Sequence, residues 1–364
     1  MTSSSRVAVV GTGLIGTSIA LAGLRSGDEV CGFDVDPEVL TRAAARSGLT
    51  PAPSLEACVR EASLVFLCTP IEFIPPLAAE ILSLAPRAVV SDVGSVKSRV
   101  LFDVEVAARP EDLTRFVGGH PMGGSERSGP EWASASVLDG IVWVLTKGTR
   151  TDEASARQLS AWVERIGARP VWMEALRHDR LVGIVSHLPQ VASTALMGLA
   201  ASEESGEPDI LLLAAGGFRD LTRLAASSPS LWSDILLANR QAVGEAIDLY
   251  IARLSDMRDL VLEGSAEGVE RSFSEAKRAR LSLAAKPQVK TGVAVLQVPV
   301  PDRPGALAEL TAVLGAAGVN IEDVQIVHSP EGGRGTVHLT VSAAAAEGAE
   351  RALKARGFEP RRLA

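Results

Sequence analysis

The chain is 364 residues long, 46% of its residues are hydrophobic, and its formal net charge at pH 7 is −8. A chain of this length is expected to form two or three domains, each with its own core. The negative charge and the lack of any lysine-rich or arginine-rich run argue against nucleic acids and anionic membranes as partners and favour a small molecule. Residues 1–5 are polar and lead directly into the first strand, and we see no apolar run long enough to cross a bilayer. We therefore expect a cytoplasmic protein without a secretory signal.

The cysteine content indicates no special chemistry. Cys31, Cys58 and Cys68 lie in or near apolar segments of the first domain and show no C-x-x-C spacing. We therefore expect buried thiols, with neither a disulfide nor a metal site.

Residues 6–34 contain the pattern of a dinucleotide-binding motif. A buried strand leads into Gly11, Gly13 and Gly16 at G-x-G-x-x-G spacing, a helix with one apolar face follows, and a second apolar strand ends on Asp34. Gly11 should permit the tight turn, Gly13 the approach of a pyrophosphate, and Gly16 close packing of helix on strand. The stretch therefore predicts a nucleotide cofactor.

The acid at the end of the second strand bears on which nucleotide binds. Asp34 lies close to the spacing of about 20 residues at which a carboxylate accepts hydrogen bonds from the ribose 2′-hydroxyl. A carboxylate there would repel the 2′-phosphate of NADP, so the sequence favours NAD. In the alternative interpretation Asp34 is a helix N-cap or a turn residue, because Asp36 and Pro37 follow it.

The next strand predicts further cofactor contacts. The apolar run 62–68 stops at Thr69 and Pro70, and ligands of open parallel sheets bind at such carboxyl ends. We expect these two residues, together with Leu14 and Ile15 at the start of the first helix, to contact NAD.

The alternation of strands and helices continues to about residue 175. Strand 88–92 is followed by polar residues, and strands at 141–145 and 170–173 flank an amphipathic helix of roughly residues 152–166. This order predicts an α/β Rossmann-type nucleotide-binding domain over residues 1–175.

Residues 176–286 show no strand pattern. Apolar residues recur at three- and four-residue spacing, as at Ile235, Val243 and Ile247, which predicts an all-α domain. Helices as apolar as residues 187–200 need partners on more than one face, so we expect a homodimer formed through this domain. A self-contained monomeric bundle is the alternative.

The last segment, residues 290–364, follows a polar linker and has the order of a small α+β module, βαββαβ. It resembles an ACT domain, a regulatory module that often binds amino acids, in the runs DRPGAL at 302–307 and GVNI at 318–321. Backbone amides at the start of the helix after Pro304 and Gly305 could bind the carboxylate of an amino-acid effector. The alternative is a purely structural dimer module.

Four motifs in the first two domains resemble the prephenate dehydrogenase family, which makes the precursor of tyrosine. They are GHPMGGSE at 119–126, DVGSVK at 92–97, SHLP at 186–189 and GGFRDLTR at 216–223. The resemblance implies that NAD oxidises prephenate and that carbon dioxide is lost, giving 4-hydroxyphenylpyruvate.

The catalytic roles are those that the resemblance implies. His120 would accept the proton of the substrate hydroxyl, as an imidazole suits, and the glycines beside it would let the substrate approach. Ser95 would share that hydroxyl and hold His120 in the right tautomer, or would instead be a helix N-cap. Glu126 would orient His120 from behind, or would simply begin a helix.

Prephenate is a dianion, so cationic side chains are expected around it. By the resemblance Arg223 would bind a carboxylate, or it would form a plain surface salt bridge. Arg219 lies four residues earlier on the same predicted helix, which Gly216 begins, and would rather pair with Asp220 or a neighbouring acid. His187 is either a substrate contact or a core histidine that caps its helix. In many family members a second histidine follows SHLP, whereas this chain has Gln190, whose amide oxygen could accept a hydrogen bond from the ammonium group of arogenate. Arogenate is therefore the nearest alternative substrate.

Two other classes of protein would also combine an NAD-binding domain with further domains, and one sequence feature speaks against each. A 3-hydroxyacid or 6-phosphogluconate type dehydrogenase would be expected to supply a catalytic lysine, and none occurs at residues 180–200. A regulator that only senses NAD would not need a general base, so that interpretation does not explain His120.

Overall fold

The computed structural model describes residues 5–123, 128–204, 206, 209–285, 293–301, 303–328 and 334–363. It divides into two compact units, Met1–Val269 and Glu270–Ala364, and each is described by itself.

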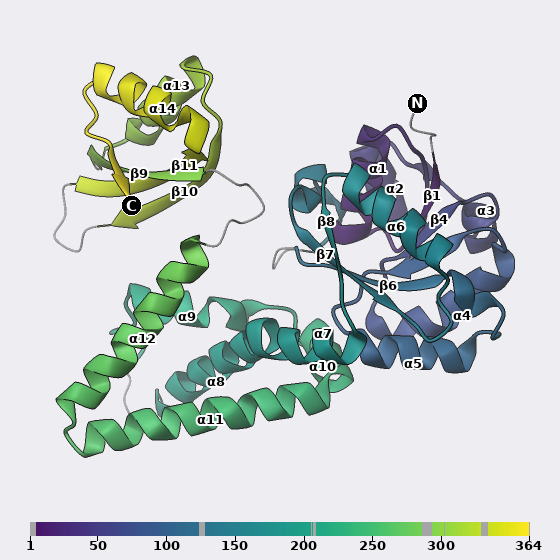
Figure 1. Ribbon diagram of the computed structural model, residues 1–364, viewed down its shortest axis with the longest axis horizontal. Helices are drawn as coiled ribbons and strands as arrows, with labels where there is room; N and C mark the ends of the chain where they lie inside the picture. The colour runs from purple at the N-terminus through teal and green to yellow at the C-terminus, as the bar shows by residue number, and fades with distance from the viewer. Residues whose placement is uncertain are drawn as a thin grey trace. The chain divides into compact units, whose positions relative to one another are not determined.

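The first unit is built on a twisted sheet of eight strands in the order β3-β2-β1-β4-β5-β6-β7-β8 (Figure 1). All neighbours are parallel except β6 and β7, which are antiparallel. The strands are β1 (Arg6–Val10), β2 (Glu29–Phe33), β3 (Thr50–Pro51), β4 (Leu64–Leu67), β5 (Val89–Asp92), β6 (Phe116–Pro121), β7 (Val142–Lys147) and β8 (Arg169–Trp172).

Helices cover both faces of this sheet because its strands bury side chains on both faces. Val7 and Val9 belong to the apolar core under α1, α2 and α6, whereas Ala8 and Val10 belong to the core under α3, α4 and α5. These helices are α1 (Leu14–Arg25), α2 (Pro37–Ser47), α3 (Leu55–Val59), α4 (Ile74–Leu84), α5 (Ser98–Ala107) and α6 (Glu153–Arg165). Short 3-10 turns join them: η1 (Ile71–Phe73), η2 (Asp112–Arg115), η3 (Pro130–Trp132) and η4 (Ala135–Leu138).

From Ala175 onward the described part of the first unit is helical (Figure 1). A turn of π-helix, η5, interrupts the first long run immediately before α8, and π-turns of this kind are frequent at functional sites. The elements are α7 (Ala175–Val182), η5 (Gly183–His187), α8 (Leu188–Glu203), α9 (Gly216–Thr222), η6 (Arg223–Ala226), α10 (Pro229–Ala238) and α11 (Arg240–Leu262). The last helix, α12 (Ala266–Ala285), begins in the first unit and continues into the second.

The run Ala175–Glu203 is long and apolar enough to cross a membrane by length and composition. The sequence expectation that no such run exists was therefore wrong on that criterion. A single helix of this kind is weak evidence for a span, because core helices of soluble proteins pass the same test.

The second unit contains a four-stranded antiparallel sheet in the order β10-β11-β9-β12, covered by two helices whose apolar residues form its core. Its elements follow the expected βαββαβ order: β9 (Val293–Pro301), α13 (Ala306–Ala316), β10 (Ile321–His328), β11 (Arg334–Ser342), α14 (Ala343–Ala355) and β12 (Arg361–Leu363). The three predicted fold types are thus confirmed, whereas the exact domain boundaries stay predictions.

The cysteines differ in part from expectation. All three are free thiols, but only Cys58 is buried, and Cys31 and Cys68 are half-buried.

Candidate active site

The glycine loop has the conformation that its spacing predicts. Gly11 adopts φ = +90°, a left-handed conformation that favours glycine, and a Cβ there would lie 2.5 Å from the carbonyl oxygen of Cys68. A Cβ on Gly16 would overlap the carbonyl oxygen of Gly11 and lie 3.0 Å from Val9 Cγ1, so this glycine lets helix and strand pack closely. A Cβ on Gly13 would meet no protein atom within 4 Å. The open side of the loop is therefore at Gly13, the N-cap of α1.

Asp34 closes this loop from the end of β2. Its Oδ2 accepts hydrogen bonds from the backbone N (2.7 Å) and Oγ1 (3.1 Å) of Thr12, and its Oδ1 accepts one from the backbone N of Asp36 at 3.0 Å. The N-cap of α2 is Asp36, whose side chain accepts from Glu38 N and Val39 N. Asp34 is therefore not the cap of α2, but its bond to the backbone N of Asp36 is that of a turn residue, as the alternative interpretation expected. Its half-buried carboxylate also lies at the glycine loop.

The predicted contacts on neighbouring strands lie at the same edge of the sheet. A Cβ on Gly11 would come within 3.1 Å of Thr69 Cγ2, and Thr69 Oγ1 is buried without a hydrogen-bond partner in the described part of the chain. Pro70 is exposed and precedes η1, while Leu14 is buried and Ile15 half-buried in the first turn of α1. An unpaired buried hydroxyl beside an open glycine loop fits a polar ligand.

The end of β6, which carries His120, is held by a buried ion pair. Lys97 Nζ pairs with Asp92 Oδ2, and both side chains are fully buried. The other carboxylate oxygen of Asp92 accepts from Gly119 N at 3.1 Å, and Gly94 N donates to Oδ2 at 2.9 Å. Asp92 therefore fixes the backbone immediately before His120.

The glycines before His120 serve strand packing. A Cβ on Gly119 would lie 2.5 Å from the backbone oxygen of Asp92, and one on Gly118 would overlap Thr146 Oγ1. Protein atoms fill the space that the sequence analysis assigned to an approaching substrate.

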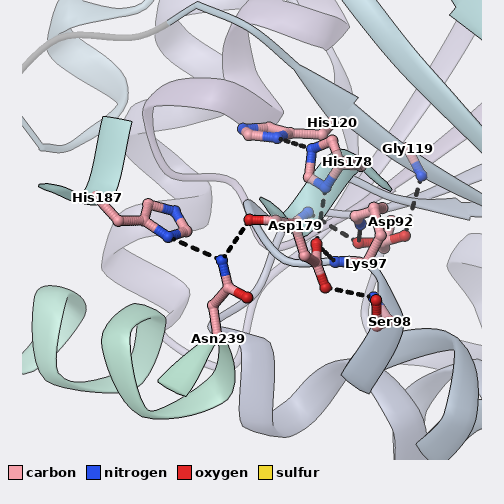
Figure 2. Close-up of polar contacts among 10 residues, drawn as sticks. Asp92, Lys97, Ser98, Gly119, His120, His178, Asp179, His187 and Asn239 are labelled. Carbon is pink, nitrogen blue, oxygen red and sulfur yellow. Dashed lines mark hydrogen bonds and ion pairs between the residues drawn. The ribbon is translucent and has the colours of Figure 1, made fainter. Parts of the chain in front are cut away.

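A chain of hydrogen bonds joins His120 to the helical part of the unit, as Figure 2 shows. His120 Nδ1 lies 2.9 Å from His178 Nε2, and His178 Nδ1 lies 2.8 Å from Asp179 Oδ1. The same carboxylate accepts 2.8 Å hydrogen bonds from the backbone N of Lys97 and of Ser98 at the start of α5. Asp179, from α7, therefore caps a helix of the Rossmann part and orients the histidine that contacts His120.

The chain continues on the other side of Asp179. Asn239 Nδ2 donates to the backbone oxygen of Asp179 at 2.9 Å and lies 3.1 Å from His187 Nδ1 (Figure 2). His187 is 1% exposed, and its Nε2 has no hydrogen-bond partner among the residues that the structure describes. Because Asn239 donates to Nδ1, the neutral His187 ring carries its proton on Nε2 and offers an unused donor.

Burial sets the charge of these rings. Desolvation, aided by the nearby His178 and Lys97, lowers the pKa of His120 well below its usual value, and desolvation lowers the pKa of His187 to about 4. Burial also lowers the pKa of Lys97, and the charge of Asp92 opposes that shift. Both histidines are therefore neutral at neutral pH.

Of the other predicted catalytic residues, Ser95 is half-buried in the loop between β5 and α5. That helix begins at Ser98 with Lys97 as its N-cap, so the helix-cap interpretation of Ser95 is wrong. Glu126 lies outside the described residues.

Gln190 is 5% exposed, and its Nε2 donates to the backbone oxygen of Leu224 at 2.8 Å, which ties α8 to η6. Gly216, at the start of α9, and Arg219 are exposed. The predicted helix ends at Thr222, and the exposed Arg223 opens the 3-10 turn η6 in right-handed conformation. Arg223 therefore lies next to the residue that Gln190 binds.

Sequence reasoning missed His178, Asp179 and Asn239. The only feature of the sequence that could have indicated them is the position of the adjacent pair His178-Asp179, which follows the predicted domain boundary closely. Apart from the bond between the adjacent His178 and Asp179, their hydrogen bonds join residues 52 to 82 positions apart, so no local pattern could reveal them.

Comparison with known proteins agrees with this architecture. Three family models match: the nucleotide-binding domain of prephenate dehydrogenase over residues 19–172, its dimerization domain over 174–275, and the ACT domain over 294–358. The prephenate dehydrogenase of Bacillus subtilis (strain 168) is 33% identical over 342 residues, which cover 92% of this chain and 91% of that protein.

Solved structures of similar chains include a prephenate dehydrogenase and an arogenate dehydrogenase. Prephenate dehydrogenase from A. aeolicus, in complex with hydroxyphenyl propionate and NAD+, superposes with a TM-score of 0.72 at 30% identity, covering 77% of this chain and 99% of that one. Synechocystis arogenate dehydrogenase gives a TM-score of 0.66 at 28% identity and covers 76% of this chain and 99% of that one. With its nucleotide-binding, dimerization and ACT domains, this chain belongs to the prephenate dehydrogenase family.

Proposed function

We propose that this chain catalyses the NAD-dependent oxidation and decarboxylation of prephenate to 4-hydroxyphenylpyruvate. The observation that carries the proposal is the hydrogen-bonded chain from His120 through His178, Asp179 and Asn239 to His187. It brings a neutral imidazole at the end of a Rossmann strand together with polar groups from the helical domain. Family membership supplies the substrate class.

The glycine loop, Asp34 and Thr69 are the residues that would hold NAD. The open space at Gly13 suits a pyrophosphate at the N-terminus of α1, and the half-buried carboxylate of Asp34 suits a ribose hydroxyl rather than a phosphate. When bound, NAD supplies the hydride acceptor.

His120 would act as the general base. Its lowered pKa keeps the ring neutral, so one ring nitrogen can accept the proton as the O–H bond of the ring alcohol breaks and hydride leaves the same carbon. The resulting ring ketone is conjugated with the two ring double bonds that flank the carbon bearing the carboxylate. When the bond to carbon dioxide breaks, its electron pair moves through the ring to the ketone oxygen, which leaves an aromatic phenol after protonation. The chain therefore needs to support only the first step and to orient the ring. Ser95 is proposed to share the substrate hydroxyl, and Glu126 to act behind His120.

The substrate's anionic groups need donors. His187 Nε2–H is a buried neutral donor without a protein acceptor in the described structure, and Arg223 is the proposed carboxylate ligand, with Arg219 and Gly216 on the preceding helix. Gln190 is proposed to border this side of the site while it ties η6 to α8.

Arogenate is the second candidate substrate, since a similar solved structure is an arogenate dehydrogenase. Selection of arogenate by Gln190 would use its amide oxygen, which lies 3.5 Å from Ser227 Oγ. That oxygen already accepts from the Ser227 hydroxyl, and the amide nitrogen donates to the backbone oxygen of Leu224, so both polar atoms of the side chain have partners within the protein. Gln190 by itself therefore does not favour arogenate over prephenate.

The test is to follow absorbance of the reduced nicotinamide with NAD or NADP and with each substrate separately. We expect turnover with prephenate and NAD, release of one carbon dioxide per reduced cofactor, and slower reaction with arogenate. Faster turnover of arogenate would reverse the substrate assignment, and no reaction with either would remove the function.

We propose tyrosine as an effector of the ACT domain. A pocket of about 300 Å³ there is lined by Arg303, Glu309, Arg356 and Phe358, among others, and offers charges of both signs beside an aromatic ring. Calorimetric titration should show binding of tyrosine that Arg303→Ala weakens. No heat and no change in activity would remove feedback control.

We also propose that the chain is a homodimer in the cytoplasm. Large apolar side chains of the helical region are exposed in the single chain, including Leu212 (78%) and Leu213 (79%) in the turn before α9 and Leu249 (60%) on α11, and such surfaces mark interfaces. A monomer mass by light scattering at micromolar concentration would contradict the dimer.

A further inference from the structure

We propose that Asp179 and His178 are positioning residues that fix the tautomer of His120, placing its ring proton on Nδ1 and leaving Nε2 free to accept the substrate's proton. This inference rests on the proposed role of His120 as the base. It goes further by naming which nitrogen reacts and what determines the choice.

The carboxylate of Asp179 determines which atom donates in each hydrogen bond between Asp179, His178 and His120. Its oxygens accept hydrogen bonds from two backbone N–H groups at the start of α5, at 2.8 Å each. Burial by itself would raise the pKa of the Asp179 carboxyl group. The hydrogen bonds from His178, Lys97 and Ser98 have the larger combined effect, so the pKa is lowered. Because an ionised carboxylate can only accept, His178 Nδ1, 2.8 Å from Oδ1, must carry a proton and donate it.

The position of the proton on His120 follows from the number of protons on each neutral imidazole ring, which is one. With one proton on the His178 ring, its Nε2 is an acceptor. His120 Nδ1 lies 2.9 Å from that nitrogen, so it must be the donor. The single proton of a neutral His120 is therefore on Nδ1, and Nε2 is bare.

A second proton on His178 would reverse this last bond, so the neutral His178 ring is part of the same inference. His178 is 1% exposed, and the carboxylate of Asp179 already accepts hydrogen bonds from the backbone amides at the start of α5. The NMR experiment below tests this point directly, because a doubly protonated His178 would be seen in it.

The tautomer matters because a general base needs an unprotonated nitrogen directed at the substrate hydroxyl. With the opposite tautomer His120 would present N–H to that hydroxyl and could accept nothing. Once His120 has taken the proton on Nε2, its Nδ1–H still donates to His178, and the Asp179 carboxylate behind it stabilises the new positive charge.

The direct test is nitrogen NMR of the full chain with 15N-labelled histidine, without substrate. The chain has five histidines, so comparison with His120→Asn and His178→Gln assigns the two signals. We expect His120 to be protonated on Nδ1 and bare on Nε2. A proton on Nε2 of His120, or a doubly protonated His178, would overturn the proposal. Because no turnover is involved, failure of the proposed function cannot be mistaken for failure here.

Two substitutions at His178 then separate positioning from a merely structural role. Glutamine can put an acceptor oxygen near the place of Nε2, whereas methionine fills similar space without one. We expect His178→Met to lower kcat about 100-fold with little change in the KM for NAD, and His178→Gln to recover most of that loss. His338→Gln on β11 is the matched control and should leave kcat unchanged.

Equal kcat for both His178 variants, whether both high or both low, would contradict the proposal. If His178→Met does not fold, the wild-type tautomer and the kcat of His178→Gln still decide the question.

Discussion

The two ends of the proposed site are built in different ways. At the glycine loop the backbone makes the site: Gly11 provides a left-handed turn, Gly16 close packing, and Gly13 an open space. Around His120 buried side chains make it, through hydrogen bonds that cross from β6 to α7. The function of the glycine loop should therefore be sensitive to any added side chain, whereas the function of His120 should be sensitive to the loss of a single polar atom.

The largest expected effect is at the polar end. His120→Asn removes the base while keeping a polar group of similar length, so kcat should fall by about 10² to 10⁴ with little change in the affinity for NAD. Steady-state kinetics with prephenate and NAD measure both quantities. Unchanged turnover would show that the reaction needs no base at this position.

A smaller effect is expected at the glycine loop. Gly13→Ala meets no protein atom within 4 Å, so the fold should persist, but the new methyl group would occupy the space proposed for a pyrophosphate. We expect the KM for NAD to rise roughly 10-fold or more, with kcat less affected.

Gly244→Ala on α11 also meets nothing within 4 Å and serves as the matched control for an added methyl group. If Gly13→Ala bound NAD as tightly as this control, the cofactor would not lie where we propose.

The two ends also differ in how far sequence could predict them. The glycine loop was readable because Gly11, Gly16 and Asp34 lie within one strand–helix–strand unit, where spacing determines geometry. His120 was found through its motif, but its partner His178 is 58 residues away on another element. The glycines beside His120 were assigned to substrate access, whereas packing against Asp92 explains Gly119. Long-range side-chain pairing depends on the folded structure, and no local pattern encodes it.

A further expected effect concerns the pH dependence of stability at the buried His187. The pKa of His187 is about 4 in the folded chain and about 6.5 when unfolded, so between these values the unfolded chain binds a proton that the folded one does not. Stability should therefore fall as the pH drops through this window. His187 alone should contribute a loss of about 2 kcal/mol from about pH 7 to about pH 5.

Urea unfolding at the two pH values measures this loss, and His187→Asn should reduce it even if that variant is less stable throughout. His338→Asn is the control with a histidine removed elsewhere. An unchanged pH dependence in His187→Asn would mean that the ring is not held neutral.

The central claim is that a neutral His120, with its pKa held down by burial, is the base. The pH dependence of kcat/KM for prephenate at saturating NAD tests it most directly, because this quantity reports the free groups before the substrate binds. We predict that activity persists below the ordinary imidazole pKa of about 6.5 and falls only at more acid pH, and that His120→Asn lacks this acid limb. An acid limb at or above about 6.5, or the same limb in His120→Asn, would contradict the account.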